Sequence, residues 1–505
     1  MSYLLGIDLG TSSLKTIVMS QDGKILSSDA VDYQFDSPVQ GYAEQDPQVW
    51  WQACVSTIRN AVAKAAVDVN EIAALGFSGQ MHGVVMLDRD CQVIRPAILH
   101  CDARSEDQVK YLNETIPLEK RQRLFRNPVY PGFMLTSLLW VRDNEPENYE
   151  RIAHVCSPKD YIRYLLCGVF SSEYSDASAT LLFDIEKNTW SEEILSLTGL
   201  PRDIYPKCTE PTALVGTLTA SAAELTSLAR KTRVAAGGGD LTMMAVGNGM
   251  VRNGDGILNI GTSGQVSFQI DRPVINPALN TNMFSSYHSG RWVLYGATMS
   301  AGLCLKWWRQ TAGNPSYKVV NELTAKAAPG SGGVIFYPYL NGERCPHLMS
   351  DISSCFLGVN ASTGFGEMTR AVMEGVVFNL RQCAEVCAGL GFSANTYLAS
   401  GGAARSDVWT QIMADVFNRP IKRVIGEEQA CLGAALTAGV AAGMWNSIPE
   451  AADAVVRYQD RVFLPDPRTA AVYDEYYQLF RDTFPQFSRN LRRLTNLGRS
   501  FTSGK

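Results

Sequence analysis

A short motif occurs twice in this chain, and the repeat restricts the folds that the chain can adopt. Residues 3–9, YLLGIDL, form an apolar run that is followed by the turn GTSS and by a second apolar run, LKTIVMS. Residues 257–268, ILNIGTSGQVSF, repeat the pattern, with the same Gly-Thr-Ser turn and with Asn259 in the place of Asp8. Each copy is typical of two strands joined by a tight turn. A repeat of this kind predicts two similar halves.

The segments that follow each motif alternate in type. Residues 46–66 have helical periodicity and open on Asp46-Pro47, a helix cap followed by proline. Residues 72–79, IAALGFSG, are typical of a buried strand. Residues 366–391 predict a long helix with a glycine at its end, and NTYLASGG then predicts a strand and a glycine turn. Alternating strands and helices predict the α/β class.

The length of the chain and the repeat together predict two domains. A chain of 505 residues exceeds one ordinary domain. The glycine-rich stretch GNGMVRNGDG indicates a junction near residues 245–255. We expect a first domain over residues 1–248, a second over 249–455, and a helical tail over 456–505 that packs on the second domain.

The composition argues against several classes of partner. The chain is 46% apolar and 19% charged, with a net charge of −5 and no run rich in Lys or Arg. We therefore expect neither nucleic acid nor a membrane as a partner. No secretory signal and no long apolar span is evident, and the 12 cysteines without paired spacing are typical of a reducing compartment. These features predict a cytoplasmic protein.

The two Gly-Thr-Ser turns are candidate phosphate-binding loops. Their side chains are small, and their backbone N–H groups and hydroxyls can surround phosphate oxygens. Two such turns that faced each other would hold a polyphosphate from both sides. Two ordinary β-hairpins are the alternative, because one isolated GTS carries almost no information. No G-x-x-x-x-G-K-[ST] loop and no protein-kinase motif set occurs, so ATP binding would need another scaffold.

A second candidate site is the stretch AAGGGDLTMM, residues 235–244, in which three glycines precede Asp240. It is either a catalytic loop or a turn whose aspartate caps the next helix, and the two interpretations are compatible. Glycines at 237–239 would leave clearance for a substrate and for nucleotide phosphates.

The paired turns resemble the phosphate motifs of the actin-like, ribonuclease-H-like ATPase superfamily. Within it, the chain is similar to the FGGY carbohydrate kinases, because residues 354–374, SCFLGVNASTGFGEMTRAVME, match the second signature of that family. Similarity to the xylulokinase branch extends along nearly the whole chain. It includes EQDPQVWW, GFSGQMHGVVMLD, RPAIL, PKDYIRYLLCG, SDAS, GGGD, NGERCPH and GGAARSDVW.

The resemblance implies two actin-like domains with a cleft between them, and an ATP-dependent transfer of the γ-phosphoryl group to a sugar hydroxyl. Such a reaction depends on positioning, charge neutralisation and a base that accepts the hydroxyl proton. The resemblance assigns Asp240 as that base and Asp8 as a second catalytic residue that faces Mg²⁺, through water. The turns implied to hold the ATP phosphates are Gly10, Thr11 and Ser12 on one side and Gly261, Thr262 and Ser263 on the other.

The sugar contacts are implied in the same way. Met81 and His82, in SGQMHG, are expected to line the sugar pocket. Asp102 and Arg104 are expected at the rim of the pocket, and a simple salt-bridged loop is the alternative for this pair. Lys15 is either a positively charged helper near the phosphates or a surface lysine on a strand.

The adenosine site is implied by ASGGAARSD, residues 399–407. The turn at Gly401 and Gly402 would let the base lie against the backbone, and Ser406 would begin the supporting helix. A further helix over residues 426–439 is rich in small residues, and for Gly433 within it we expect close helix packing.

Several positions depart from the xylulokinase branch. They are Leu241 in place of Asn, His100-Cys101 in place of Trp-Asn, Ser137 in place of Lys and Cys345 in place of Thr. The phosphate and base positions are kept, so the reaction is expected. The identity of the sugar is less constrained, because the loss of one polar contact can change substrate preference strongly.

D-xylulose is therefore the first expected substrate. The alternatives are an FGGY kinase for another sugar, such as ribulose, a hexulose, a pentitol or a sugar acid, and a non-catalytic actin-like protein that senses sugar or nucleotide. Sugar and ATP are the expected partners, and the sequence leaves a homodimer open.

Overall fold

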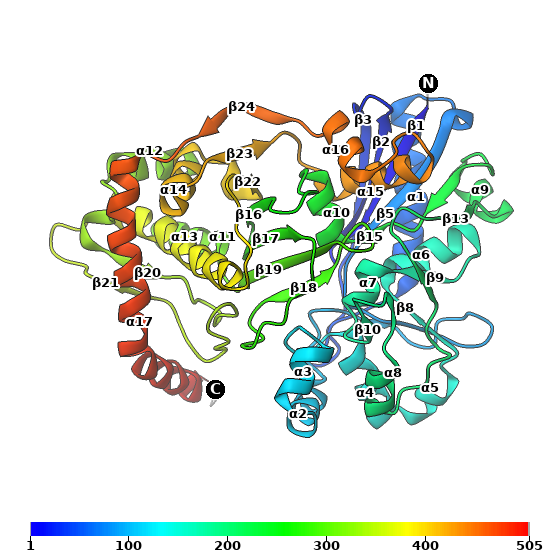
Figure 1. Cartoon of the computed structure of the whole chain (residues 1–505), viewed down its shortest axis with the longest axis horizontal. Coiled ribbons are helices and arrows are strands. Elements are labelled where there is room, and N and C mark those ends of the chain that lie inside the picture. The colour runs from blue at the N-terminus through cyan, green and yellow to red at the C-terminus, as the bar shows by residue number, and fades with distance from the viewer. Residues whose placement is uncertain (1, 503–505) are drawn as a thin grey trace.

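The computed structural model describes residues 2–502 and arranges them around two seven-stranded sheets (Figure 1). In the first sheet β1 lies at the centre, antiparallel to β2 and parallel to β5. The strands in spatial order are β13 (Leu214–Thr217), β14 (Arg233–Ala235), β5 (Ile72–Gly79), β1 (Tyr3–Leu9), β2 (Ser13–Ser20) and β3 (Ile25–Asp32), with β15 (Gly238–Gly239) also paired to β5.

The second sheet repeats this arrangement. Its strands in spatial order are β18 (Asn282–Ser285), β19 (Trp292–Thr298), β17 (Gly264–Ile270), β16 (Gly256–Ile260), β22 (Tyr397–Ser400), β23 (Ile421–Val424) and β24 (Tyr458–Phe463). Like β1, β16 is antiparallel to the next strand in the chain and parallel to the strand on its other side. The order β3–β2–β1–β5–β14 thus matches β19–β17–β16–β22–β23. The predicted repeat and the α/β class with two actin-like domains are confirmed.

Five small two-stranded sheets connect the larger elements. They are β4 (Glu44–Gln45) with β7 (Ala97–Ile98), β6 (Val85–Leu87) with β8 (His154–Cys156), β9 (Ser171–Glu173) with β12 (Lys207–Thr209), β10 (Phe183–Asp184) with β11 (Thr189–Trp190), and β20 (Ile335–Tyr337) with β21 (Cys355–Leu357).

Helices cover the sheets and fill the segments between them. Those before the second sheet are α1 (Pro47–Ala65), α2 (Glu106–Thr115), α3 (Leu118–Leu124), α4 (Met134–Asn144), α5 (Pro146–Arg151), α6 (Pro158–Cys167), α7 (Tyr174–Ser178), α8 (Glu192–Thr198), α9 (Ala220–Thr226) and α10 (Asp240–Gly247). The later ones are α11 (Gly302–Thr311), α12 (Tyr317–Lys326), α13 (Phe365–Gly389), α14 (Asp407–Phe417), α15 (Gln429–Ala441), α16 (Ile448–Val455) and α17 (Pro467–Thr502). Within residues 2–502 no helix is both long and apolar enough to cross a membrane.

The helix α1 forms where its capping signals predict. The Asp46 carboxylate accepts a hydrogen bond from the backbone N–H of Gln48, and Pro47 occupies the first helical position, where its missing N–H costs nothing. The apolar side of α1, which includes Trp50 and Ile58, is fully buried in the first domain's core.

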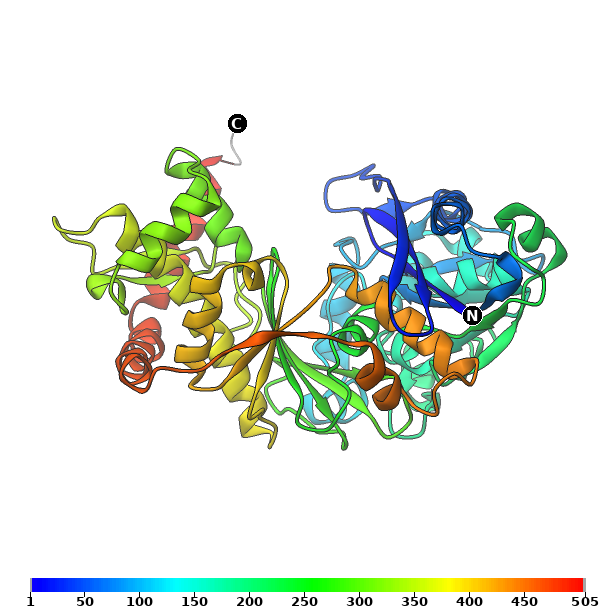
Figure 2. The same ribbon diagram turned by 90° about the horizontal axis from the view of Figure 1, so that it is seen from above.

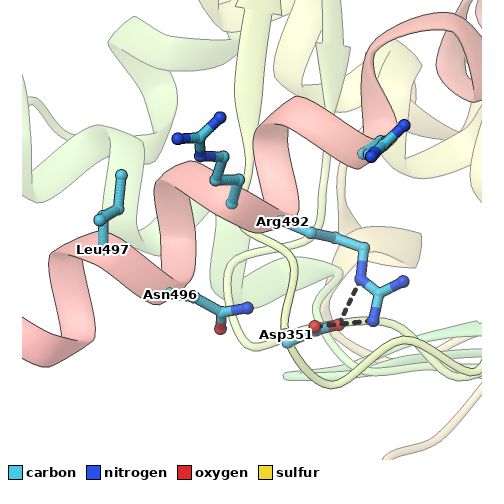
Figure 3. A pocket seen from close by; sticks show the side chains of 6 residues that line it. Asp351, Arg492, Asn496 and Leu497 are labelled. Atoms are coloured by element: carbon cyan, nitrogen blue, oxygen red, sulfur yellow. Dashed lines mark hydrogen bonds and ion pairs between the residues drawn. The ribbon is translucent and has the colours of Figure 1, made fainter.

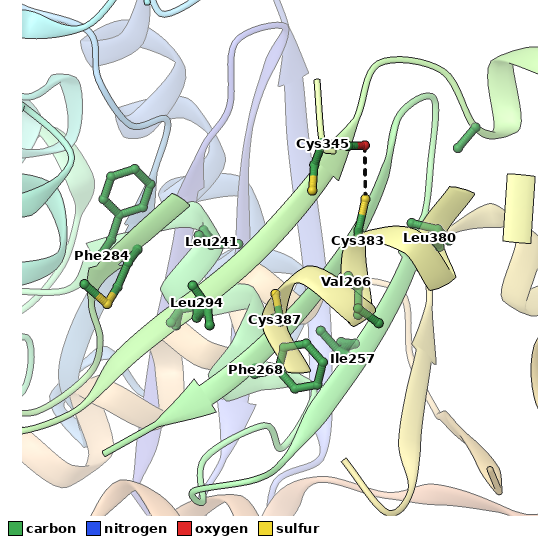
Figure 4. Packing of buried hydrophobic residues seen from close by; sticks show 14 of the residues in the cluster. Leu241, Ile257, Val266, Phe268, Phe284, Leu294, Cys345, Leu380, Cys383 and Cys387 are labelled. Carbon is green, nitrogen blue, oxygen red and sulfur yellow. Dashed lines mark hydrogen bonds between the residues drawn. The ribbon is translucent and has the colours of Figure 1, made fainter. Parts of the chain in front are cut away.

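The long helix α13 covers the second sheet. Figure 4 shows Cys383 and Cys387 of this helix facing Val266 and Phe268 of β17, and the Cys383 thiol donates a hydrogen bond to the carbonyl of Cys345 at 3.3 Å. The helix ends before Gly391, which has a φ of +95°, so the predicted glycine at the helix end is present.

The helices α15 and α16 lie against the first sheet, although residues 249–455 are the range expected to form the second domain. A Cβ on Gly6 of β1 would overlap the carbonyl of Cys431, and one on Gly76 of β5 would overlap that of Ala434. In Figure 2 the orange segment that contains these helices lies beside the blue strands of the first sheet. The domain bounds stay a prediction, and the structure adds that the chain returns to the first sheet before β24.

The helix α15 also packs closely on α10, the helix that follows β15 of the first sheet. A Cβ on Gly433 would overlap the carbonyl of Met243, and a Cβ on Gly247 would overlap that of Gln429. Glycine is required at both positions because the two backbones touch. The close helix packing expected for Gly433 is therefore confirmed.

The final helix, α17, contacts α13 and α14 of the second domain. Its far end is held to the loop before β21, because the Arg492 guanidinium forms two hydrogen bonds of 2.8 Å with the Asp351 carboxylate (Figure 3). Thr495 adds a hydrogen bond to Ser353 at 2.9 Å.

Candidate active site

The turn between β1 and β2 presents free backbone donors. Gly10 N–H donates to Ser13 at 2.9 Å, which closes the turn. The carbonyl of Gly10 accepts from Tyr33 Oη at 2.7 Å, and the carbonyl of Thr11 accepts from Gln45 Nε2 at 2.9 Å. Among residues 2–502 the N–H groups of Thr11 and Ser12 have no protein acceptor, and Ser12 is exposed. The turn is thus anchored through its carbonyls and leaves its donors open to an anion.

The turn between β16 and β17 is anchored in the same manner. Gly261 N–H donates to Ser263 at 3.0 Å, and the carbonyls of Gly261 and Thr262 accept from the first amides of α11, Gly302 at 2.8 Å and Leu303 at 3.1 Å. Thr262 and Ser263 are exposed. This turn is one residue shorter than the first, because residues 261–263 replace residues 10–13 between the paired strand ends.

Asp8 and Asp240 are brought close by the register of the first sheet. Ser78 of β5 is paired with Asp8 of β1 on one side and with Gly238 of β15 on the other, and Asp240 follows two residues later. The Ser78 hydroxyl donates to Asp8 Oδ1 at 2.6 Å. Burial raises the pKa of Asp8, against the effect of the Ser78 hydrogen bond and of Lys15. Ser78 lay within the family fragment GFSGQMHGVVMLD, but no role was assigned to it there.

The carboxylate of Asp240 combines the position and the protonation behaviour of a general base. Burial, followed by the negative charge of Asp8, raises the pKa of Asp240 to about 7, although the backbone N–H of Leu241 donates to it at 2.7 Å. A base whose pKa lies near neutrality can accept a proton and release it at physiological pH. Asp240 is the first residue of α10 and the cap position belongs to Gly239, so the interpretation of Asp240 as a helix cap is wrong.

The three glycines before Asp240 pack closely against protein atoms, and the expectation that they also leave clearance for substrate stays a prediction. A Cβ on Gly237, whose φ is +76°, would lie 2.5 Å from the carbonyl oxygen of Phe77. A Cβ on Gly238 would lie 2.6 Å from the terminal methyl of Met243, and one on Gly239 would lie 2.7 Å from Cγ of Met81. The glycines therefore let this strand approach β5 and α10.

His82 is held in one orientation. It has a φ of +72°, and its Nδ1 lies 2.7 Å from the carbonyl oxygen of Ala179, so Nδ1 carries the proton and donates it. Burial lowers the pKa of His82 to about 3, so the ring is neutral and Nε2 is an acceptor. The ring packs on Phe133 and Phe284, at centroid distances of 4.3 and 5.5 Å.

Met81, which follows β5, lies beside the segment that carries Asp240. Met81 is 5% exposed and is the residue that a side chain at Gly239 would strike, which brings it next to the segment that carries Asp240. The assignment of Met81 and His82 to a sugar pocket stays a prediction, and the position of Met81 next to Gly239 is compatible with it.

Asp102 and Arg104 form a buried ion pair. Arg104 donates to the two Asp102 oxygens at 2.9 and 2.8 Å. The backbone N–H of Ala43 also donates to Asp102 Oδ2, at 2.6 Å. Arg104 also contacts Glu44 at 2.6 Å and stacks on the ring of Tyr42 at 3.9 Å. Because both carboxylate oxygens have protein partners, the geometry favours the salt-bridged loop over a sugar contact for this pair.

Two residues near the site, Tyr295 and Arg344, had no role predicted from the sequence. Tyr295 of β19 packs on Phe284 at 5.9 Å, and the charge of Asp240 adds to the burial that raises the pKa of Tyr295. Arg344 lies over the ring of Tyr130 at 5.4 Å and lowers the pKa of His82 through its charge. Arg344 lay within the family fragment NGERCPH, whereas a tyrosine in an apolar strand gives no signal.

Leu241 follows Asp240 at the position where the xylulokinase branch has Asn. It is 9% exposed and belongs to the apolar cluster that also contains Phe284 and Leu294 of the second sheet. Figure 4 shows Leu241 between these two residues. The side chain after the base is therefore part of the core between α10 and the second sheet.

A cavity of about 510 Å³ lies at the end of β22, where adenosine is expected. Gly401 and Gly402 line it together with residues of the segment before α15. A Cβ on Gly401, whose φ is +81°, would lie 2.5 Å from the Ile260 carbonyl oxygen, whereas one on Gly402 would meet no atom within 4 Å. The Ser406 hydroxyl caps α14 through Trp409 N–H at 3.2 Å and donates to Asn321 at 2.8 Å, so the expected helix start is confirmed.

Lys15 lies beside Asp8 in the sheet and forms an ion pair with Glu428, whose Oε2 is 3.1 Å from its Nζ. The pair is partly exposed.

The residues present fit a Mg²⁺ that binds mainly through nucleotide phosphates. Within residues 2–502 no group of three or more His, Cys, Asp and Glu side chains could hold a metal ion, and Asp8 Oδ2 has no protein donor. Magnesium is commonly bound through one or two carboxylates plus phosphates and waters.

Two related α/β domains, each with an open donor turn, and a buried acid beside one of the turns define a phosphotransferase of the actin-like type. Models of the FGGY family of carbohydrate kinases match the chain over residues 3–247 for the N-terminal domain and 256–442 for the C-terminal domain. The chain belongs to the FGGY family of carbohydrate kinases and is an ATP-dependent sugar kinase.

Relatives in this family match over almost the full length. A xylulose kinase of Lactococcus lactis is 34% identical over 490 residues, which cover 97% of this chain and 97% of the relative. A xylulose kinase of Bacillus subtilis is also 34% identical, over 96% of this chain and 97% of the relative. A crystal structure of a xylulose kinase from Brucella ovis superposes with a TM-score of 0.91 at 31% identity, over 96% of this chain and 99% of that one.

Proposed function

We propose that this protein is a xylulose kinase that transfers the γ-phosphoryl group of ATP to a hydroxyl of D-xylulose. The xylulose kinases among its relatives support the choice of sugar, since they align over nearly all of both chains. The observation that carries the proposed chemistry is the buried Asp240, whose pKa is raised to about 7 by burial and by Asp8.

Asp240 is the general base in this proposal. Its carboxylate accepts the proton of the sugar hydroxyl as that oxygen bonds to phosphorus, and the P–O bond to ADP breaks. Its position at the first residue of α10 fixes the carboxylate relative to the helix, and the Leu241 N–H orients one oxygen. The other oxygen is the one that receives the proton.

The two turns are proposed to hold the ATP phosphates, the first through Gly10, Thr11 and Ser12 and the second through Gly261, Thr262 and Ser263. Their free amides and exposed hydroxyls support this role. Asp8 is proposed to hold Mg²⁺ through water, and the bound ion would neutralise phosphate charge. The adenosine is proposed to occupy the cavity at Gly401 and Gly402.

The sugar is proposed to bind beside Met81 and His82, where His82 Nε2 accepts a hydrogen bond from a sugar hydroxyl. The fixed tautomer supports this role, because the Ala179 carbonyl requires the proton on Nδ1. Asp102 and Arg104 are proposed to act at the rim by holding the loop that carries His100, with no direct sugar contact.

An assay of sugar-dependent ADP release tests the proposal across ketopentoses, hexuloses, pentitols and sugar acids. We expect the highest kcat/KM for D-xylulose. A higher value for another sugar would replace the substrate and keep the kinase chemistry, whereas no turnover with any sugar would favour a sensor.

We further propose a cytoplasmic enzyme, because the reaction consumes ATP. A homodimer is tested by light scattering after size-exclusion chromatography. A mass twice the 55.3 kDa of one chain would support the homodimer, and a mass of one chain would contradict it.

A further inference from the structure

The segment that carries Asp240 is built from the least restrained residues in the chain, and it needs support from outside. Glycine loses more backbone freedom on folding than any other residue, and Gly237, Gly238 and Gly239 directly precede the acid. A base must be held to within roughly 0.5 Å of its productive position. The cap residue of α10 is Gly239, which has no side chain to contribute.

Two buried side chains fix this segment from behind. The Arg163 guanidinium donates to the carbonyl of Ala236 at 2.7 Å. The backbone N–H of Gly239 donates to the hydroxyl of Ser175 at 2.9 Å. Ser175 lies on α7 and is fully buried, and its bond ends one residue before Asp240.

Glu173 determines which way the Ser175 hydroxyl points. The Glu173 carboxylate accepts hydrogen bonds from the Ser175 backbone N–H at 2.7 Å and from its hydroxyl at 2.8 Å. A hydroxyl has one proton and two acceptor positions, so once the proton is given to Glu173 a lone pair is left for Gly239. The geometry selects the acceptor role that the Gly239 N–H requires.

A cluster of buried charges holds Glu173 in place. Lys159 Nζ lies 3.2 Å from Glu173, 2.7 Å from Asp160 and 2.9 Å from Asp176. Arg163 completes the cluster through Asp160 at 2.9 Å. All five side chains are 0% exposed. Breaking a buried pair leaves an uncompensated charge, so the pairs of Lys159 with Glu173 and of Arg163 with Asp160 hold these side chains in place.

We propose that Ser175 is a positioning residue for the phosphoryl-transfer reaction: it transmits the rigidity of the Lys159 charge cluster to Gly239 and thereby fixes Asp240. The inference rests on the proposed role of Asp240 as the base. The cluster side chains line neither the two turns nor the cavity at Gly401, and they reach the site through the backbone of residues 236–239. The stem of Lys159 also packs on Gly79 at the end of β5, and the bond from Gly239 to Ser175 is the link that ends beside Asp240.

The same short helix fixes two other parts of the site. The carbonyl of Ala179, directly after α7, is the acceptor for His82 Nδ1. The Ser178 hydroxyl accepts from the backbone N–H of Ser285 in the second domain at 3.0 Å. Ser175 is the member of this group that acts on the base.

The test is steady-state kinetics of the full-length Ser175→Ala and Ser175→Cys variants. Cysteine keeps nearly the same volume and is a much weaker acceptor, so it serves if the alanine variant does not fold. We expect kcat to fall about 10- to 100-fold, since a displacement of about 1 Å can cost 10²-fold. The KM values for sugar and for ATP should change less than about twofold, because uniform binding is retained.

The matched control is Thr180→Val. Thr180 is 1% exposed on the same segment, and its hydroxyl contacts the Ala177 carbonyl and the Leu182 N–H but nothing in residues 236–240. We expect Thr180→Val to lower the thermal midpoint and to keep kcat. The Ser175 variants should lower the midpoint as well, because the buried Gly239 N–H loses its acceptor, but their kcat should fall far more than that of Thr180→Val at a comparable midpoint. Ser175→Thr, which keeps the hydroxyl, should recover most of kcat.

Two results would overturn the inference. One is an unchanged kcat in folded Ser175→Ala or Ser175→Cys protein. The other is a fall in kcat that Thr180→Val shares in proportion to its loss of stability. If Asp240→Asn were fully active, the proposed base would fail, whereas an inactive Asp240→Asn beside a normal Ser175→Ala would defeat this inference alone.

Discussion

In each domain one row of paired residues crosses four strands, and the strands of the two rows are equivalent in the two sheets. The residues in the two rows differ in charge. In the first sheet the row reads Ala30, Lys15, Asp8 and Ser78, and in the second it reads Ala297, Gln265, Asn259 and Ser400. Both rows lead to a Gly-Thr-Ser turn with free donors. The turn with open donors is thus built twice, whereas the row beside it carries charged side chains, Lys15 and Asp8, in the first sheet alone.

The difference indicates a division of labour. An acid beside the first turn raises the pKa of Asp240 and offers an oxygen for a hydrated cation. A neutral amide beside the second turn adds no repulsion to a polyphosphate. Asn259 Oδ1 instead lies 2.6 Å from where a Cβ on Gly401 would be, at the wall of the cavity expected to take adenosine. We propose that the first domain supplies the catalytic acids and that the second mainly binds the nucleotide.

The largest effect is expected for Asp240→Asn, which removes the proposed base next to the charged row of the first sheet. We predict that kcat falls by about 10³-fold, within the range found for loss of a general base. The thermal midpoint at pH 8 should rise, because the ionised carboxylate is destabilised by burial and by Asp8. ADP release and thermal unfolding measure the two quantities, and turnover near the wild-type rate would exclude Asp240 as the base.

A smaller loss is expected for Asp8→Asn, which gives the first row the same neutral amide as the second. We predict a fall in kcat of roughly 10²-fold, the size of losing one electrostatic contact to the reacting groups. The double variant Asp8→Asn/Asn259→Asp exchanges the two residues and should not recover activity. Recovery in that variant would show that the two rows are interchangeable and would contradict the different roles proposed for them.

Substitutions at Gly401 and Gly402 test whether the second domain binds the nucleotide. Gly402→Ala should raise the KM for ATP about tenfold, roughly 1.4 kcal/mol, and leave stability unchanged, because the added methyl meets only the open cavity. Gly401→Ala should also destabilise the fold by about 1–3 kcal/mol, because it strains a residue with positive φ. An unchanged KM for ATP in Gly402→Ala would move the adenosine elsewhere.

The smallest effect is expected for Lys15→Met. The Lys15–Glu428 pair is partly exposed, and such pairs contribute about 0–1 kcal/mol. We predict a change in kcat/KM of less than about threefold, scaled from that contribution. A tenfold rise in the KM for ATP would instead identify Lys15 as a phosphate contact.

The parts of the fold that depend on local signals were predictable from the sequence. The strand over residues 3–9, the cap at Asp46 and the buried strand over residues 72–79 depend on neighbouring residues, and the structure has them at those bounds. The repeat at Asp8 and Asn259 is local in each copy, so comparing the copies revealed the second sheet.

Long-range packing was not predictable in the same way. The return of α15 to the first sheet depends on contacts between Gly6 and Cys431, which lie in opposite halves of the chain. The close packing of the glycines before Asp240 was not predicted, because Phe77 and Met81, their neighbours, belong to a different strand and turn. Tyr295 was missed for the same reason. Ser175 lay within the family fragment SDAS, but its contact with Gly239 was not predictable from that fragment.

The proposed chemistry depends on Asp240 acting as a base whose pKa is raised by burial and by Asp8. It is tested most directly by the pH dependence of the rate with both substrates far below their KM values, because that rate reports ionisations of the free enzyme. A base must be ionised to accept a proton, so we predict that the rate rises with pH through about 7. In Asp8→Asn the rise should move to lower pH. A rate that stays flat from about pH 5 to 8, or a rise that Asp8→Asn leaves in place, would contradict the claim.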